Sequence, residues 1–182
     1  MQGERSDLHN YVYSSEMVEF VTAANAYCQF IDQLKGQEGK AFIAEAMACL
    51  SDVYASFVKL GTTEPLSESP GEPTVSEQEW ATIYQRILMN LGAHNDYLRL
   101  ADENEFDRSE LVTHTISEDA ADVYQELRDF TTIYSRGLEE LMNDAAWELG
   151  ERFAEHWGRK LLRSLLALHD LFVSGIDPTE KE

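Results

Sequence analysis

The sequence contains little cysteine. Only Cys28 and Cys49 occur among its 182 residues, far fewer than the disulfide scaffold of a small secreted protein requires. We expect both thiols to act as small hydrophobic core residues. A turn near residue 37 would also bring the two thiols close together, so a disulfide between them is the alternative.

Long hydrophobic runs are absent as well. The longest uninterrupted apolar stretch is AMACL at residues 46–50, whereas a membrane-spanning helix needs roughly 18 apolar residues. The N-terminal residues MQGERSDLHNYVYSSE also lack the apolar segment of a signal peptide. These absences predict a cytoplasmic protein that makes no contact with a membrane.

Basic residues are scarce. The chain has 14 Lys and Arg against 34 Asp and Glu, which gives a net charge of −20 at pH 7. This charge disfavours direct binding to nucleic acid, because nucleic acid is itself a polyanion. Apolar residues nevertheless make up 43% of the chain and aromatic residues 10%, which is enough for one sizeable core. The length predicts a single domain over residues 1–182.

Apolar residues recur at steps of three and four along most of the chain. This spacing predicts an all-α, single-domain helical bundle of about five main helices. We expect these helices at residues 14–34, 43–60, 76–91, 117–134 and 138–172. The last would be a long C-terminal helix of about 50 Å, and Gly150 and Gly158 are positions where it could bend. Ser76 and Glu79 have the spacing of a capping box at the start of the third helix.

The remaining segments give weaker signals. Three of the four prolines lie in residues 62–75, which we expect to form an exposed loop. Residues 92–116 mix acids with scattered apolar residues and show no strand-like alternation, so we expect short helical turns there. The folded core is expected at residues 14–175, with flexible tails at 1–13 and 176–182.

Three segments carry a resemblance to a known family. They are MVEFVTAANAYCQFID at 17–32, ISEDAADVYQELRDF at 116–130 and GLEELMNDAAWELGERFAEHWGRKLLRSLLALH at 137–169. Together they resemble the domain of unknown function DUF5063, which is found mostly in gut Bacteroidetes, and the resemblance covers nearly the whole chain. It implies an all-helical, cytosolic bacterial protein. It implies no catalytic residue.

Two acidic helix faces are candidates for a metal site. One consists of Asp119, Asp122, Glu126 and Asp129, and the other of Glu140, Asp144, Glu148, Glu151 and Glu155. If the two helices faced each other across a groove, their carboxylates could hold Mg²⁺ or Mn²⁺. All-α nucleotide pyrophosphatases use paired motifs of this kind, although the order and spacing of the two halves differ here. The alternative, which we favour, is that the acids of residues 140–155 form a solvated face opposite the apolar stripe.

One basic stripe interrupts the acidic surface. Its members are Arg152, His156, Arg159, Lys160 and Arg163, which occupy one face of the long helix. Such a stripe could bind phosphate or an acidic segment of a partner. The alternative, which we favour, is that these residues pair with the protein's own acids, either within the helix or on the face from Asp119 to Asp129.

Recognisable catalytic signatures are missing from the sequence. There is no repeated Glu-x-x-His, no Cys/His cluster, no Walker A loop and no Gly-x-Ser-x-Gly. We therefore expect a non-enzymatic protein-binding or adaptor module without a cofactor, whose partner is another protein with a basic surface; a homo-oligomer is also possible. The alternative is a nucleotide or phosphoester hydrolase that uses Mg²⁺ or Mn²⁺, with Arg159 or Lys160 holding phosphate. A third possibility is a mimic of nucleic acid.

Overall fold

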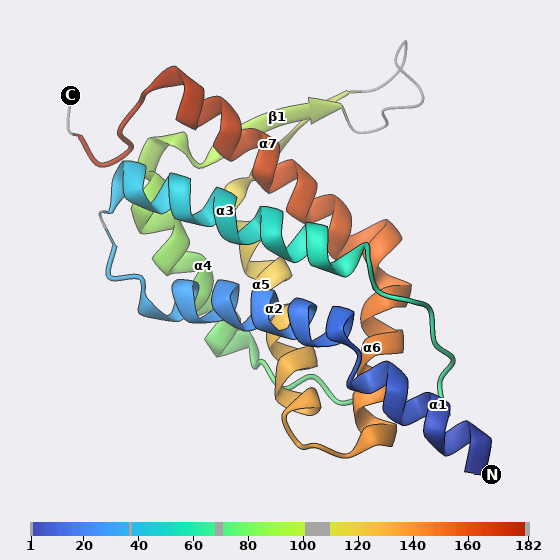
Figure 1. Ribbon diagram of the computed structural model, residues 1–182. Helices are drawn as coiled ribbons and strands as arrows, with labels where there is room; N and C mark the ends of the chain where they lie inside the picture. Colours follow the sequence, from blue (N-terminus) through green and yellow to red (C-terminus); the bar gives the residue numbers. More distant parts are fainter. Residues whose placement is uncertain (1, 37, 68–70, 101–109, 181–182) are drawn as a thin grey trace.

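The computed structural model describes residues 2–36, 38–67, 71–100 and 110–180. It confirms an all-α bundle and adds one small antiparallel sheet of two strands (Figure 1). The elements in chain order are α1 (Gln2–Val12), α2 (Ser15–Gln33), α3 (Gly39–Phe57), α4 (Glu77–Leu91), the 3₁₀ turn η1 (Gly92–His94), β1 (Asp96–Leu100), β2 (Leu111–Thr115), α5 (Ile116–Tyr134), α6 (Glu139–Arg152), the π-helical turn η2 (Phe153–Trp157) and α7 (Gly158–Ser174).

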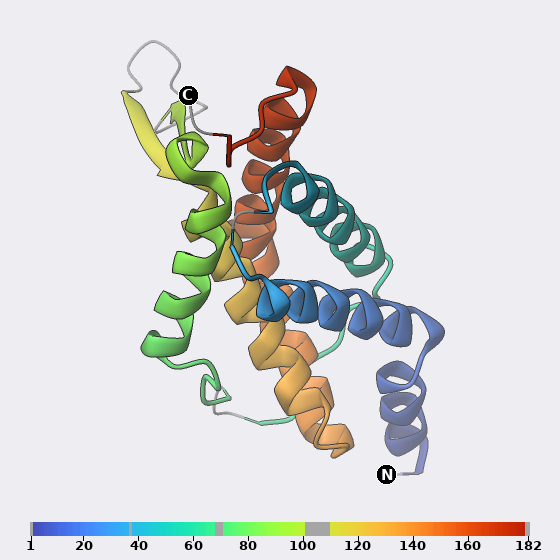
Figure 2. The same cartoon turned by 90° about the vertical axis from the view of Figure 1, so that its left-hand side faces the viewer.

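Helix α5 is the central element of the bundle. It packs against α2, α4, α6 and α7, and Figure 2 shows it between α4 on one side and the α2–α3 pair on the other. Its buried residues include Ala121, Val123 and Leu127, none of which retains any exposed surface.

Side-chain caps mark the start of three helices, α2, α4 and α5. The hydroxyl of Ser14 accepts a hydrogen bond from the backbone N–H of Met17, which fixes the start of α2. Ser76 and Glu79 form the predicted capping box at the start of α4, with bonds in both directions. The N-cap of α5 is Thr115, whose side chain accepts a hydrogen bond from the Glu118 N–H, so this helix begins directly at the end of β2.

Aromatic rings fill the centre of the core. Phe57 contacts Phe20, Phe153 and Trp157, with ring centroids 5.2, 4.4 and 4.8 Å apart. These rings come from α2, α3 and the π-helical turn, so they join three elements that are distant in sequence. Trp157 is completely buried, and edge-to-face packing of this kind stabilises aromatic pairs beyond their burial.

The long C-terminal helix is interrupted at the second predicted position. In the π-helical turn η2, the N–H of Phe153 bonds to the carbonyl of Gly150, and the N–H of Gly158 bonds to the carbonyl of Phe153. The shift leaves the Leu149 carbonyl available, and the indole N–H of Trp157 donates to it at 2.8 Å. The insertion thus provides the buried indole with a hydrogen-bond partner.

Residues 92–116 differ from the prediction. They contain a 3₁₀ turn followed by an antiparallel hairpin, in which Asp96 pairs with Thr115 and Leu100 with Leu111. The prediction of helical turns without strands was therefore wrong for the described part of this segment. Residues 101–109 lie outside the described residues. In Figure 1 the hairpin projects from the bundle beside α7.

The N-terminal residues also differ from the prediction. Residues 2–12, expected to be part of a flexible tail, form helix α1. The Tyr11 hydroxyl donates to the Gly61 carbonyl at 3.1 Å, the Tyr134 hydroxyl donates to the Val12 carbonyl at 2.6 Å, and His9 Nδ1 lies 2.7 Å from a carboxylate oxygen of Glu139. These contacts attach α1 to α6, to the end of α5 and to the loop after α3.

Near the other terminus, residues 176–180 form a turn that lies against the bundle. Asp177 accepts hydrogen bonds from the N–H and the hydroxyl of Thr179, and these bonds lower the pKa of its carboxyl. Asp177 and Thr179 lie so close to Gly39 that a side chain at position 39 would collide with them. The turn therefore covers the start of α3.

Candidate functional site

Asp119 on α5 and Arg163 on α7 form the most buried ion pair among the described residues. Arg163 Nη2 lies 2.8 Å from Asp119 Oδ1, and its Nε lies 3.2 Å from Oδ2. The Asp119 side chain is only 5% exposed. The hydroxyl of Tyr97 on β1 donates to the same carboxylate, so this one group joins α5, α7 and the hairpin.

Contact with Asp119 favours the protonated forms of both Arg163 and Tyr97. The hydrogen bonds from Arg163 to Asp119 raise the pKa of the guanidinium. Burial, followed by the hydrogen bond to Asp119, raises the pKa of the Tyr97 hydroxyl. Tyr97 therefore remains protonated and donates to Asp119, so the buried carboxylate accepts hydrogen bonds from both Tyr97 and Arg163.

The next acids on α5 also face members of the basic stripe. Asp122 pairs with Lys160 and accepts a hydrogen bond at 2.7 Å from the indole N–H of Trp80. Glu126 lies 3.2 Å from Arg152 Nη1 and 3.1 Å from His156 Nδ1. With Asp119 and Arg163, these contacts form a series of ion pairs along the junction of α5 with α6, η2 and α7, which we call the α5 ion-pair series.

Other predicted metal ligands hold the proline-rich loop. Oδ1 of Asp129 accepts three hydrogen bonds, from the Thr74 N–H at 2.6 Å, the Thr74 hydroxyl at 2.7 Å and the Val75 N–H at 2.8 Å. Asp144 accepts from the Leu66 N–H at 2.7 Å, and Glu148 accepts from the Gly71 N–H. These carboxylates bind backbone donors of residues 62–75 that would otherwise need water.

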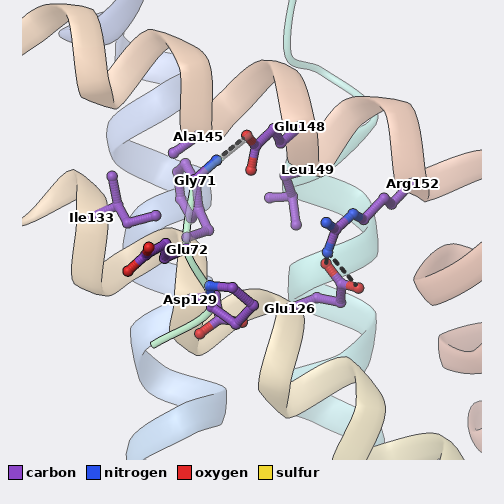
Figure 3. A pocket seen from close by; sticks show the side chains of 11 residues that line it. Gly71, Glu72, Glu126, Asp129, Ile133, Ala145, Glu148, Leu149 and Arg152 are labelled. Carbon is purple, nitrogen blue, oxygen red and sulfur yellow. Dashed lines mark hydrogen bonds and ion pairs between the residues drawn. The ribbon is translucent and has the colours of Figure 1, made fainter. Parts of the chain in front are cut away.

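The two acidic faces do converge at one small hollow (Figure 3). Glu126 and Asp129 of α5 and Glu148 and Arg152 of α6 line it, together with Gly71 of the loop. Its volume of about 30 Å³ is room for a water or two. In Figure 3, Glu148 points to the Gly71 N–H and Glu126 to Arg152. No three His, Cys, Asp or Glu side chains among the described residues are placed to hold a metal ion.

The remaining predicted site residues lie apart from these contacts. Glu140 is exposed on the first turn of α6. Arg159 lies 4.0 Å from Glu155 in an exposed pair on one helix, a geometry of little energetic value. Glu151 lines a different hollow, beside Trp147. The structure thus brings ten of the predicted acids and bases, Asp144 included, into contact around α5 and the loop. It leaves Glu140, Glu151, Glu155 and Arg159 outside these contacts.

A further polar cluster was not among the predicted site residues. Asp32 at the end of α2 accepts hydrogen bonds from the Tyr124 hydroxyl at 2.8 Å and from Arg128, both on α5. Burial, followed by the bond to Asp32, raises the pKa of Tyr124 to about 12. These residues line a hollow of about 650 Å³ that also contains Arg86 and Glu79. Its two acids and two arginines balance in charge.

An exposed apolar surface lies where the hairpin meets α7. It consists of Leu98, Leu111, Leu162 and Leu166, which we call the hairpin–α7 surface. Leu98 and Leu111 are 63% and 64% exposed, and Leu166 on α7 is 47% exposed. These three leucines line one common hollow. Contiguous apolar surface of this kind is typical of an interaction site.

Charged residues of both signs lie at the hairpin–α7 surface. Asp170 and Arg99 line the hollow with the leucines, and Asp96, Glu110 and Glu118 are exposed on the hairpin and the first turn of α5. The hollow itself is thus lined by one acidic and one basic side chain. None of the described helices is long and apolar enough to cross a bilayer.

Comparisons with known proteins agree with this fold. The chain superimposes on the crystal structure of protein BF1032 from Bacteroides fragilis with a TM-score of 0.78 and 28% sequence identity, covering 89% of this chain and 98% of that one. No curated protein matches the sequence. The family described as domain of unknown function (DUF5063) matches residues 11–174, and the chain therefore belongs to the DUF5063 family.

Proposed function

We propose that this protein is a non-enzymatic, cytoplasmic protein-binding module, and that its docking site is the hairpin–α7 surface. The observation that carries the proposal is the exposure of Leu98, Leu111 and Leu166 around one hollow. The bundle has buried hydrophobic residues on every main helix, so these leucines are not needed to close the core. A partner that covers these leucines would remove their apolar surface from water, which favours association.

The shape of the surface favours a helical occupant. Leu162 and Leu166 lie four residues apart on α7 and are both exposed, so they form a ridge along the helix. The hairpin leucines Leu98 and Leu111 border this ridge across the hollow. A ridge beside a groove is the geometry in which an amphipathic helix docks through its apolar face.

The charge of the chain selects the kind of helix. A net charge of −20, with Asp170 at the hollow, attracts a partner with Lys or Arg beside its apolar residues. A second copy of this chain would bring an equal negative charge to the contact, so a homo-oligomer through this surface is disfavoured at low salt. Binding should therefore weaken as salt is added.

The hydrolase alternative requires carboxylates that are open to a metal ion. Glu126, Asp129 and Glu148 already bind cationic side chains or backbone N–H groups, which argues against that role. Melting temperatures with Mg²⁺ or Mn²⁺ at about 1 mM test the alternative, because a ligand that binds only the folded state raises the melting temperature. A rise that Asp129→Asn abolishes would favour the hydrolase over the binding module.

A synthetic peptide tests the proposed docking directly. The probe is a fluorescent Leu/Lys amphipathic helix of about five turns, compared with a scrambled peptide of equal composition and with a Leu/Glu counterpart. We expect saturable binding of the first peptide only. Leu98→Thr and Leu166→Gln should each weaken that binding about tenfold, since each removes buried apolar area. Met89→Gln is the matched control, because Met89 is 53% exposed on α4.

Two results would contradict the proposal. One is equal binding of the ordered and scrambled peptides, since this would show only attraction between opposite charges. The other is binding that Leu98→Thr and Leu166→Gln leave unchanged, which would place the peptide elsewhere. Sedimentation of the protein without peptide tests for the homo-oligomer through the same leucines.

A further inference from the structure

A second hollow lies at the opposite part of the bundle, between α1, the end of α3 and α6. It has a volume of about 620 Å³, which is within the range of small-molecule sites. Its walls include Tyr11 from α1, Phe57 from α3 and Trp147 from α6, and the loop after α3 contributes residues 61–64. Three aromatic side chains from three separate elements thus line one space.

The charged residues of this hollow all carry the same sign. Glu64 and Glu151 line it, whereas none of its lining residues is Lys, Arg or His. Neither carboxylate forms an ion pair with another side chain in the described part of the chain. By contrast, the hollow beside Asp32 contains two acids and two arginines, and its charges are already balanced.

The aromatic walls are held in place by contacts outside the hollow. The Tyr11 hydroxyl donates to the Gly61 carbonyl at 3.1 Å, which fixes α1 beside the loop. The Phe57 ring packs against Phe153 and Trp157 in the core. Trp147 makes no hydrogen bond through its indole to any described residue, and it is only partly buried. Its ring and its N–H therefore remain available to a ligand.

We propose that this hollow, formed by Tyr11, Phe57, Trp147, Glu64 and Glu151, binds a small organic cation with a methylated ammonium group. Aromatic faces attract such cations through their quadrupoles, and a quaternary ammonium is weakly hydrated, so it enters an aromatic pocket with little loss of hydration. The two carboxylates supply the compensating charge. The proposed binding uses a surface separate from the hairpin–α7 surface and does not depend on it.

Choline and its neutral analogue 3,3-dimethylbutan-1-ol provide the test, because they share a shape and differ in charge. Calorimetric titration should show choline binding at least about tenfold more tightly than the alcohol. Trp147→Leu and the double variant Glu64→Gln/Glu151→Gln should each weaken choline binding about tenfold. Glu155→Gln is the matched control: Glu155 lies four residues after Glu151 and its side chain is 84% exposed, so binding should stay within about twofold.

Spermidine distinguishes a methylated cation from any polycation. Its primary ammonium groups are strongly hydrated, so we expect weaker binding than that of choline and little effect of Trp147→Leu. Equal affinity for choline and the alcohol would overturn the proposal, as would choline binding that Glu155→Gln weakens as much as the paired variant does. If Trp147→Leu proves unfolded, the paired glutamate variant decides the outcome, because both glutamates are exposed.

Discussion

The guanidinium of Arg163 binds the carboxylate of Asp119 through two hydrogen bonds of 2.8 and 3.2 Å, and that carboxylate is almost completely buried. This contact joins α5 to α7 through two residues that lie 44 positions apart in the sequence. The pair fixes how the last helix lies on the central one, and the bond from Tyr97 to the same carboxylate extends this control to the hairpin.

The first prediction concerns this pair. Asp119→Ala leaves a partly buried guanidinium and a tyrosine hydroxyl without their acceptor, so it should lower the free energy of unfolding by about 3 kcal/mol. A double-mutant cycle with Arg163→Met, measured by urea unfolding, should give a coupling energy of about 1–3 kcal/mol. The exposed pair of Glu155 and Arg159 is the control and should couple by less than about 0.5 kcal/mol. Equal coupling in the two cycles would show that burial does not matter here.

The second prediction concerns the proline-rich loop. Asp129→Ala removes the acceptor of three hydrogen bonds from Thr74 and Val75 and should lower the free energy of unfolding by about 3 kcal/mol. Limited proteolysis with subtilisin should then cut residues 62–75 faster. Glu140→Ala, on an exposed position of α6, should change stability by less than about 0.5 kcal/mol. A loop that is cut at the same rate in wild type and Asp129→Ala is not held by this carboxylate.

The third prediction uses two glycines of the C-terminal helix. A Cβ at Gly158 would lie 2.5 Å from the Phe153 carbonyl oxygen and 2.7 Å from its ring, so Gly158→Ala should destabilise the protein by about 2 kcal/mol. A Cβ at Gly150 would meet no atom within 4 Å. Gly150→Ala should therefore stabilise the protein by up to about 1 kcal/mol through its better helix propensity. Thermal and urea unfolding measure both, and the same sign for the two variants would contradict the π-helical turn at residues 153–157.

The fourth prediction concerns pH. Burial raises the pKa of Cys28 to about 12 and that of Cys49 to about 11. Above about pH 9 the unfolded chain releases thiol protons that the native chain retains, so the unfolded state binds fewer protons and stability falls as the pH rises toward 12. A variant with both cysteines changed to Ala should show a smaller fall over the same range. Both thiols are free in the structure, and rapid reaction of the native protein with a thiol reagent at pH 8 would contradict their burial.

Patterns within one element were predictable from the sequence. The capping box of Ser76 and Glu79 depends on a fixed spacing of three, and the apolar stripes depend on the helical repeat, so both could be read without knowledge of any neighbour. The interruption of the C-terminal helix belongs to the same class, because the π-helical turn ends directly before Gly158. Local chemistry alone determines these features.

Contacts between distant segments were not predictable in the same way. The strand LVTHT has only five residues, too few for a pattern of alternating residues to predict a strand. Its partner, β1, is separated from it in the sequence by residues 101–109. The carboxylate of Asp129 binds backbone N–H groups, and every residue except proline has such a group, so its sequence gives no sign of its partner. The favoured interpretation of the basic stripe did anticipate pairing with α5, but it could not identify which acid each base would meet.

The central claim is that the charged residues around α5 hold the fold together, whereas the leucines of the hairpin–α7 surface bind a partner. Measuring both the unfolding free energy and the affinity for the Leu/Lys peptide in two variants tests it most directly. Leu166→Gln should keep stability within about 0.5 kcal/mol and lose peptide binding, while Asp122→Asn should lose about 1–2 kcal/mol of stability and keep peptide binding. The opposite pattern, with Leu166→Gln unfolding the protein and Asp122→Asn abolishing binding, would contradict the claim.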